Sequence, residues 1–183
     1  ICHFKIMSNN KTLIEDLIEA LTCLPGVGKK TAQRMTYYLL QRAKDDALNL
    51  SEVLKEVVTK TINCKSCRNL SQYELCELCS DLGRSNEMLC VVESPADVFN
   101  MENSTNYNGK YFVLLGRLSP LDGIGPKEIG IDALDKIISS GNIKEIILAV
   151  NYTVESDVTA HVVSELAIKN SVKITRLAQG VPV

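Results

Sequence analysis

Four cysteines at paired spacing are the residues of this sequence that point most clearly to a chemical function. Cys64 and Cys67 form one Cys-x2-Cys pair, and Cys76 and Cys79 form a second pair after a spacer of eight residues. Two sulfurs separated in this way can reach one ion across a tight turn, and tetrahedral zinc binds four thiolates at about 2.3 Å. The spacing therefore predicts one structural zinc ion, with no coordination position left for a catalytic water.

The segment around these pairs supports the same interpretation. Residues 61–83 contain few large apolar side chains and no steady hydrophobic period, so a metal ion would replace the missing core. Four unligated or redox-active thiols are the alternative. The thiols of Cys23 and Cys90 lie outside the pairs among apolar neighbours, and we expect them to be buried and inert.

Disulfides are not expected, because the sequence has the features of a cytoplasmic protein. No apolar run approaches the roughly 20 residues that cross a membrane. The opening ICHFKIM is too short for a signal peptide and is interrupted by Lys5. In a reducing compartment, four cysteines at paired spacing are better explained by a metal ion than by disulfides.

A second candidate site is the glycine-containing segment LPGVGKKTA, which joins two predicted helices. Gly26 and Gly28 allow backbone amides to approach a phosphate closely, and the following helix directs its free N–H groups at the anion. Lys29 and Lys30 open that helix, and Arg34 lies on the same side of it as Lys30. Such a site binds the nucleic-acid backbone and does not read bases.

The distribution of charge favours this interpretation, although the formal net charge of −2 does not. Between residues 24 and 44 the charged side chains are all basic: Lys29, Lys30, Arg34, Arg42 and Lys44. A local basic face therefore exists on a mildly acidic protein. The alternative is a helical hairpin whose turn merely needs glycine and whose lysines form a solvated surface.

Acidic residues form a third candidate site, after two predicted strands. Glu93 ends one strand, and Glu155 and Asp157 follow another, so the three would meet at the carboxyl edge of a parallel sheet. Together they could bind magnesium, which prefers oxygen ligands. They could equally be ordinary acids at the start of a helix, where the helix dipole favours them.

The elements that would position these sites divide the chain into three parts. Helical periodicity predicts helices over residues 12–22, from about residue 29, and from a Ser51 cap. After the cysteines, strand-like runs at 89–93, 111–116, 145–151 and 172–178 alternate with helical stretches at 95–103, 130–140 and 157–169. This alternation predicts an α/β domain with a mainly parallel sheet. The expected domains are residues 1–60, 61–85 and 86–183.

The order of these parts resembles one protein family, the bacterial recombination mediator RecR. The matching segments are LPGVGKKTAQRM, the four-cysteine segment, VVESPADV, LLGRLSPLDGIGPKEIGI, ILAVNYTVESDVTAHVV and VKITRLAQGVPV. The resemblance implies a helix-hairpin-helix domain, a zinc finger and a Toprim domain. It further implies a non-enzymatic clamp that assembles as a dimer or tetrameric ring, binds DNA without sequence specificity, and works with RecO and RecF to load recombinase.

The resemblance also bears on individual residues. Lys30 and Arg34 match basic hairpin positions implicated in DNA contact, and the four cysteines match the zinc ligands. Toprim enzymes carry a glutamate, matched by Glu93, and an Asp-x-Asp motif, where this chain has Asn151 and Thr153. Without those carboxylates we expect no phosphoryl-transfer chemistry, and Glu93, Glu155 and Asp157 keep at most a weak cation or partner site. A magnesium-dependent Toprim nuclease or strand-transfer enzyme is the alternative.

Other positions depart from the family pattern. Tyr152 and Ser156 stand where the family usually has proline and glycine, so a different loop shape is expected there. The family normally continues beyond Val183 into a segment that contributes to assembly, so a truncated C-terminal segment is expected, and the six residues before Met7 are not expected to be native.

Overall fold

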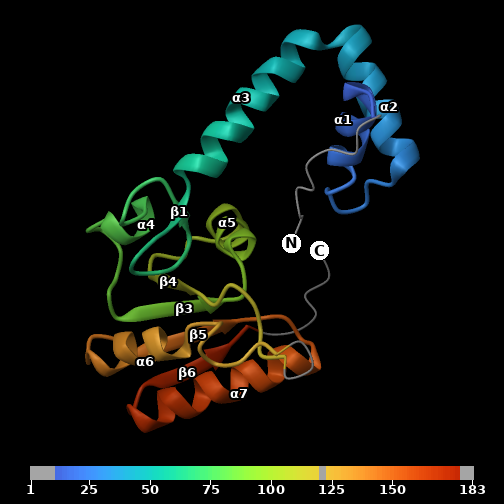
Figure 1. Ribbon diagram of the computed structural model, residues 1–183. Helices are drawn as coiled ribbons and strands as arrows, with labels where there is room; N and C mark the ends of the chain where they lie inside the picture. Colours follow the sequence, from blue (N-terminus) through green and yellow to red (C-terminus); the bar gives the residue numbers. More distant parts are fainter. Residues whose placement is uncertain (1–10, 120–122, 178–183) are drawn as a thin grey trace. The chain divides into compact units, whose positions relative to one another are not determined.

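The computed structural model describes residues 11–119 and 123–177 and divides the chain into two compact units, residues 1–60 and 61–183. We call them the helical unit and the sheet unit and describe each by itself (Figure 1). The expectations for the residues before Met7 and for the end of the last strand at residue 178 lie outside the described residues. None of the described helices combines the length and the apolar character needed to cross a membrane.

The helical unit consists of three helices, α1 (Leu13–Leu21), α2 (Lys29–Arg42) and α3 (Lys44–Lys60). α1 begins with a capping box: the Glu15 amide donates to Thr12 Oγ1 at 3.3 Å, and the Thr12 amide donates to Glu15 Oε2 at 2.8 Å. These two bonds satisfy amides that have no partner within the helix. On α2, Ala32 and Thr36 are buried one turn apart.

The third helix begins earlier than its sequence suggested. α3 starts at Lys44, and the predicted cap, Ser51, lies inside the helix with its hydroxyl donating to the Leu48 carbonyl at 2.8 Å. A serine hydroxyl can bond a preceding carbonyl as readily as it caps an amide, so its type alone does not locate a helix start. Asp45 and Asp46 occupy the first turn of α3, where the helix dipole favours acidic side chains.

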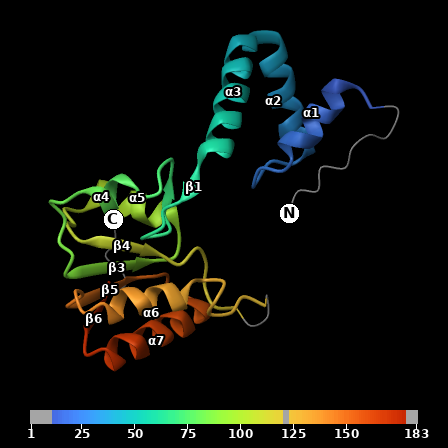
Figure 2. The ribbon, with the colours of Figure 1, turned by 60° about the vertical axis from the view of Figure 1, so that its left-hand side comes forward.

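The sheet unit contains a four-stranded parallel sheet in the order β4-β3-β5-β6. Its elements are β3 (Met88–Val92), α5 (Pro95–Ser104), β4 (Lys110–Val113), α6 (Ile131–Ser139), β5 (Glu145–Ala149), α7 (Val154–Lys169) and β6 (Lys173–Arg176). In Figure 2, α6 and α7 lie together on one side of the sheet and α5 lies on the other. The predicted α/β fold with a parallel sheet is confirmed.

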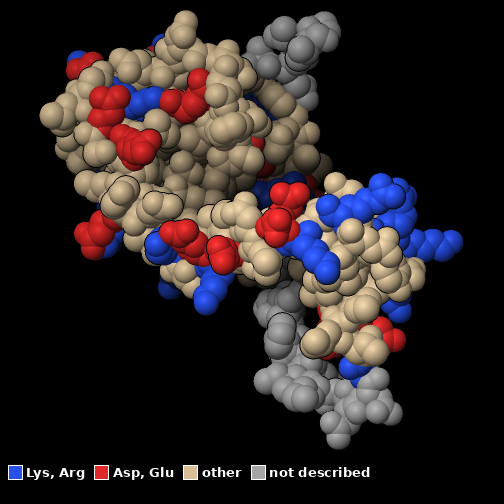
Figure 3. Space-filling model, turned by 90° about the horizontal axis from the view of Figure 1, so that it is seen from above, with Lys and Arg blue, Asp and Glu red and all other residues tan. Residues whose placement is uncertain are grey.

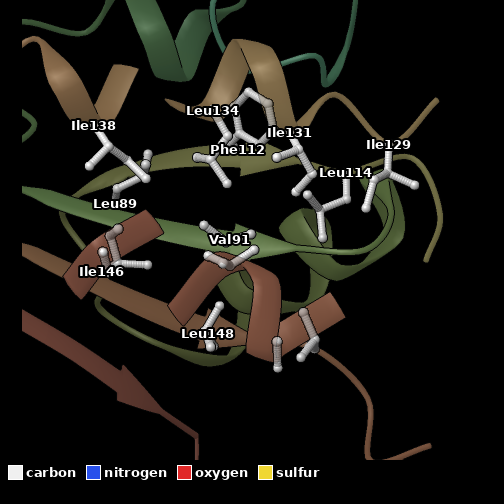
Figure 4. Packing of buried hydrophobic residues seen from close by; sticks show 14 of the residues in the cluster. Leu89, Val91, Phe112, Leu114, Ile129, Ile131, Leu134, Ile138, Ile146 and Leu148 are labelled. Carbon is white, nitrogen blue, oxygen red and sulfur yellow. The ribbon is translucent and has the colours of Figure 1, made fainter. Parts of the chain in front are cut away.

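Alternating side chains of the central strands form two cores. Leu89 and Val91 of β3 pack on the side of α6 and α7, whereas Cys90 and Val92 pack on the side of α5. Figure 4 shows the first core, in which strand residues such as Phe112 meet helix residues. Because β3 is covered on both faces, four of its five residues are buried, which is typical of a central parallel strand.

The cysteine segment precedes the sheet and has little regular structure. It contains the two-residue strands β1 (Ile62–Asn63) and β2 (Leu70–Ser71), paired antiparallel, and the short helix α4 (Glu77–Ser80). This segment belongs to the sheet unit, where α4 lies against β4. The structure thus brings the predicted metal ligands next to one edge of the described sheet.

Candidate metal centre and nucleic-acid interface

The four paired cysteines gather into one cluster. Their sulfur atoms all lie within 4.8 Å of one another, and Cys67 Sγ is 3.4 Å from Cys76 Sγ. A tetrahedral ion with bonds of about 2.3 Å would hold its sulfurs about 3.8 Å apart, so small side-chain rotations bring the cluster to that geometry. Among the residues that the structure describes, this is the one group of three or more such side chains placed to share a metal ion.

The cluster is largely shielded from solvent, and its hydrogen bonds favour a thiolate at one of the four cysteines. Cys64 and Cys67 are each 1% exposed. A hydrogen bond from the Cys67 thiol lowers the pKa of Cys79 to about 5, and the same bond raises the pKa of Cys67. Burial raises the pKa of Cys76 to about 11. A metal ion entering the cluster at neutral pH would therefore meet one thiolate and displace protons from at least two thiols.

Neither of the two other cysteines in the described part of the chain joins the cluster. Cys90 is buried in β3, and burial raises the pKa of its thiol to about 12, which agrees with the expected inert thiol. Cys23 is exposed in the turn after α1, so the expectation that it is buried is wrong. Its apolar neighbours in the sequence lie at the end of α1 and in the turn that follows, and they do not cover the Cys23 side chain.

The glycine hairpin in the helical unit has the backbone geometry that its sequence suggested. Gly26 has φ of +76°, a conformation that is costly for residues with a Cβ. Gly28 is the N-cap of α2, and among the described residues no side chain caps this helix. A Cβ added at either glycine would meet nothing within 4 Å, so the space beside the turn is open. The first amides of α2 are thus accessible to an external anion.

Basic side chains surround this turn. Lys29, Lys30 and Arg34 are all exposed, and the first turn of α2 contains no acidic residue. Figure 3 shows Lys and Arg side chains gathered on the helical unit. The structure therefore combines open helix amides with nearby positive charge, as backbone phosphates require.

The acidic edge of the sheet is organised around Glu93, which is only 8% exposed. Its Oε2 accepts a hydrogen bond from Asn151 Nδ2 at 2.6 Å, and its Oε1 accepts one from Ser156 Oγ at 2.5 Å and a longer one from the Asn151 amide at 3.3 Å. Side chains of the same protein thus occupy both oxygens of Glu93. Ser156, whose role the sequence did not reveal, is fully buried in doing so.

The other two acids lie on the first turn of α7, which begins earlier than predicted. Thr153 is the N-cap and accepts from the Ser156 amide at 3.2 Å. Asp157 pairs with Arg176 of β6 at 2.7 Å, and the Arg176 guanidinium lies 4.1 Å from the Tyr152 ring centroid. The three carboxylates do not form a shared ligand set among the described residues.

A cleft also opens at this carboxyl edge of the sheet. It has a volume of about 400 Å³ and is lined by residues that include Glu93, Asp97, Arg117 and Asn151. A second cleft of about 330 Å³ lies between α7 and β6 and is lined in part by His161 and Arg176. Open α/β sheets commonly bind ligands at the carboxyl edge.

Comparison with known proteins agrees with these features. A family model described as "RecR, helix-hairpin-helix" matches residues 14–58, and one described as "Toprim domain" matches residues 87–178. A protein of Methylococcus capsulatus named "Recombination protein RecR" is 53% identical over 169 residues, which is 92% of this chain and 85% of that protein. Proteins of the same name from Saccharophagus degradans and Xanthomonas campestris are 50% and 48% identical, each over 93% of this chain and 87% of theirs.

These matches extend over the hairpin, the cysteine cluster and the parallel sheet together. The hairpin lies within residues 14–58, the sheet within residues 87–178, and the relatives align across nearly the whole chain. The chain belongs to the RecR family of recombination proteins.

Proposed function

We propose that this protein is a recombinational repair mediator that binds DNA through the hairpin of its helical unit. The observation that carries the proposal is the uncapped N-terminus of α2 beside exposed basic side chains. The residues assigned to the DNA backbone are Gly26, Gly28, Lys29, Lys30 and Arg34. Because these groups offer amides and charges and no shape for a base edge, binding is independent of sequence.

Titration of labelled gapped DNA with purified protein tests this assignment. Replacing Lys30 and Arg34 together by alanine should weaken binding to every DNA sequence about equally and reduce the slope of log affinity against log salt by about 2. The matched control replaces Lys55 and Lys60 of α3 by alanine, which removes the same charge from the same unit. Equal affinity of the two double variants would remove the hairpin from the interface.

We further propose that the four cysteines hold one structural zinc ion. The support is a buried set of four sulfurs, the donor type that zinc prefers, in a segment with almost no core of its own. When bound, the ion supplies folding energy to this segment and no reaction, because four thiolates complete its coordination. Elemental analysis of protein prepared without chelator should find about one equivalent of zinc per chain; less than about half an equivalent would count against the site.

A magnesium-dependent nuclease or strand-transfer enzyme is the second candidate, and the acidic edge argues against it. Asn151 and Thr153, which replace the Toprim aspartates, act here as a hydrogen-bond donor to Glu93 and as the cap of α7. Hydrogen bonds from the protein's own side chains thus occupy the carboxylate oxygens of Glu93. Incubation with plasmid DNA and magnesium should give no cleavage, whereas cleavage that is lost on Glu93→Gln would establish the enzyme.

In the proposed role the protein acts as a DNA clamp, a dimer or tetrameric ring in the cytoplasm, that helps RecO and RecF load recombinase. Glu155 and Asp157 on the first turn of α7 would form a partner site or weak cation site, since both are at least partly exposed, although Asp157 is also paired with Arg176. Adding RecO to the DNA titration should increase the amount of complex on gapped DNA. Reversing the charge with Glu155→Lys should diminish that increase without changing the binding of DNA by the protein alone.

A further inference from the structure

Lys110, the first residue of β4, makes an unusual set of contacts with the second cysteine pair. Its ammonium donates to the carbonyl oxygens of Leu78 at 3.1 Å, Cys79 at 3.1 Å and Asp81 at 2.8 Å. An ammonium has three N–H donors, so these bonds use all of them. Three hydrogen bonds from one ammonium therefore hold the turn that carries Cys79 against the sheet.

The first cysteine pair is hydrogen-bonded to the other end of the same strand. The Val113 amide of β4 donates to the Cys67 carbonyl at 2.8 Å. The next residue, Arg68, donates to the carbonyls of Glu128 and Ile129, and its guanidinium lies 5.7 Å from the Phe112 ring centroid. Both cysteine pairs thus depend on the edge of the sheet for their position.

The positive charge of Lys110 would affect how strongly the cysteines bind a metal ion. Four thiolates around a divalent ion carry a formal charge of −2, and burial of most of the cluster makes that charge expensive unless cations lie nearby. Lys110 contributes one positive charge beside the second pair, where its ammonium lies 3.1 Å from the Cys79 carbonyl oxygen. Groups outside the coordination shell that orient and neutralise ligands commonly change metal affinity by about 10–100-fold.

We propose that Lys110 is a positioning residue of the metal centre, through which the parallel sheet sets the affinity of the four cysteines for their ion. The proposal rests on the zinc binding proposed above. Coupling between two sites is reciprocal, so bound metal in turn holds the β4 edge of the sheet. If Lys110 instead only caps the carbonyls at the end of α4, the loss of stability on replacing it should be the same with and without metal.

The test compares Lys110→Met with Lys110→Arg and with Lys136→Met, which removes one exposed positive charge from the same unit. Zinc affinity is measured by competition with a coloured chelator, and cobalt absorption reports whether four thiolates still bind. Lys110→Met should weaken zinc binding about 10-fold or more and leave the cobalt spectrum that of four thiolates. Lys110→Arg should recover much of the loss, and Lys136→Met should match the unmodified protein.

Thermal unfolding with and without zinc separates the two roles of Lys110. In the proposed role, Lys110→Met lowers the melting temperature more in the loaded protein than in the metal-free protein. An equal decrease in both states, or zinc affinity within twofold of the Lys136→Met control, would overturn the proposal. Failure of the unmodified protein to bind zinc would instead refute the metal site itself.

If Lys110→Met does not fold, hydrogen exchange of the unmodified protein decides the matter. Removing zinc should speed amide exchange in β4 more than in β5 and β6, because β4 alone among these strands is bonded to the cysteine turns. Equal change in all three strands would show that the metal and the β4 edge are not coupled.

Discussion

Replacing Asn151 by aspartate would place a carboxylate against the carboxylate of Glu93. In the protein, Asn151 Nδ2 donates to Glu93 Oε2 at 2.6 Å, and Glu93 is only 8% exposed. The substitution keeps the shape of the side chain, exchanges a hydrogen bond for repulsion between like charges, and restores an aspartate of the Toprim enzymes. It therefore tests whether asparagine at this position replaces a metal ion.

The expected loss of stability follows from the geometry. Two unit charges 2.6 Å apart repel by about 1.6 kcal/mol in water and by about 6 kcal/mol at an effective dielectric constant of about 20. The lost hydrogen bond to a charged group adds about 1.5–3 kcal/mol. The two carboxylates can avoid part of this repulsion by sharing one proton. Keeping that proton costs about 1.4 kcal/mol for each unit by which the pH exceeds the ordinary pKa range of carboxyl groups. Because Asn151 is itself exposed, we expect a net destabilisation of about 2–5 kcal/mol at pH 8.

Two measurements quantify this loss of stability: urea unfolding and hydrogen exchange of β3 and β5. The control is Asn142→Asp at an exposed position. Pairing raises the titration range of the two carboxylates in the folded variant, so stability is kept in acid and lost as the pH rises through that range. The difference from the unmodified protein should be smaller near pH 5 than at pH 8. Magnesium should restore part of it in the variant alone. A variant as stable as the control at pH 8, or equally destabilised at both pH values, would refute the reasoning.

Two further predictions concern the cysteine segment. Gly130→Ala should destabilise the sheet unit by about 1–3 kcal/mol, because φ is +79° at this position and an added Cβ would lie 1.8 Å from Arg68 Nη1. Thermal unfolding measures this effect, and an unchanged melting temperature would contradict it. Zinc affinity should rise at least about 100-fold per pH unit near neutrality, since the pKa of Cys79 is lowered to about 5 whereas those of Cys67 and Cys76 are raised, and at least these two thiols must lose their protons. Chelator competition between about pH 6 and pH 8 checks this; a constant affinity would exclude it.

Local patterns were sufficient to predict several elements of this protein. Cysteine spacing located the four sulfurs that the structure gathers, and the helical patterns at residues 12–22 and 95–103 located α1 and α5 to within one residue at each end. Alternating strand and helix patterns predicted the parallel sheet. These succeeded because each depends on residues near one another in the chain, whose geometry is largely independent of the rest of the fold.

Contacts between distant residues decided what the sequence left open. Ser156 reaches Glu93 across 63 positions, and Arg68 reaches Ile129 across 61. No local pattern marks such pairs, because a hydroxyl or guanidinium has the same type whether it faces solvent or a buried partner. Composition and spacing therefore determined that a four-cysteine cluster, a basic hairpin and an α/β sheet exist. Only the tertiary structure decided that the Glu93 carboxylate is hydrogen-bonded by the protein's own side chains and that Lys110 joins the cysteine cluster to the sheet, since both depend on which chain segments pack together.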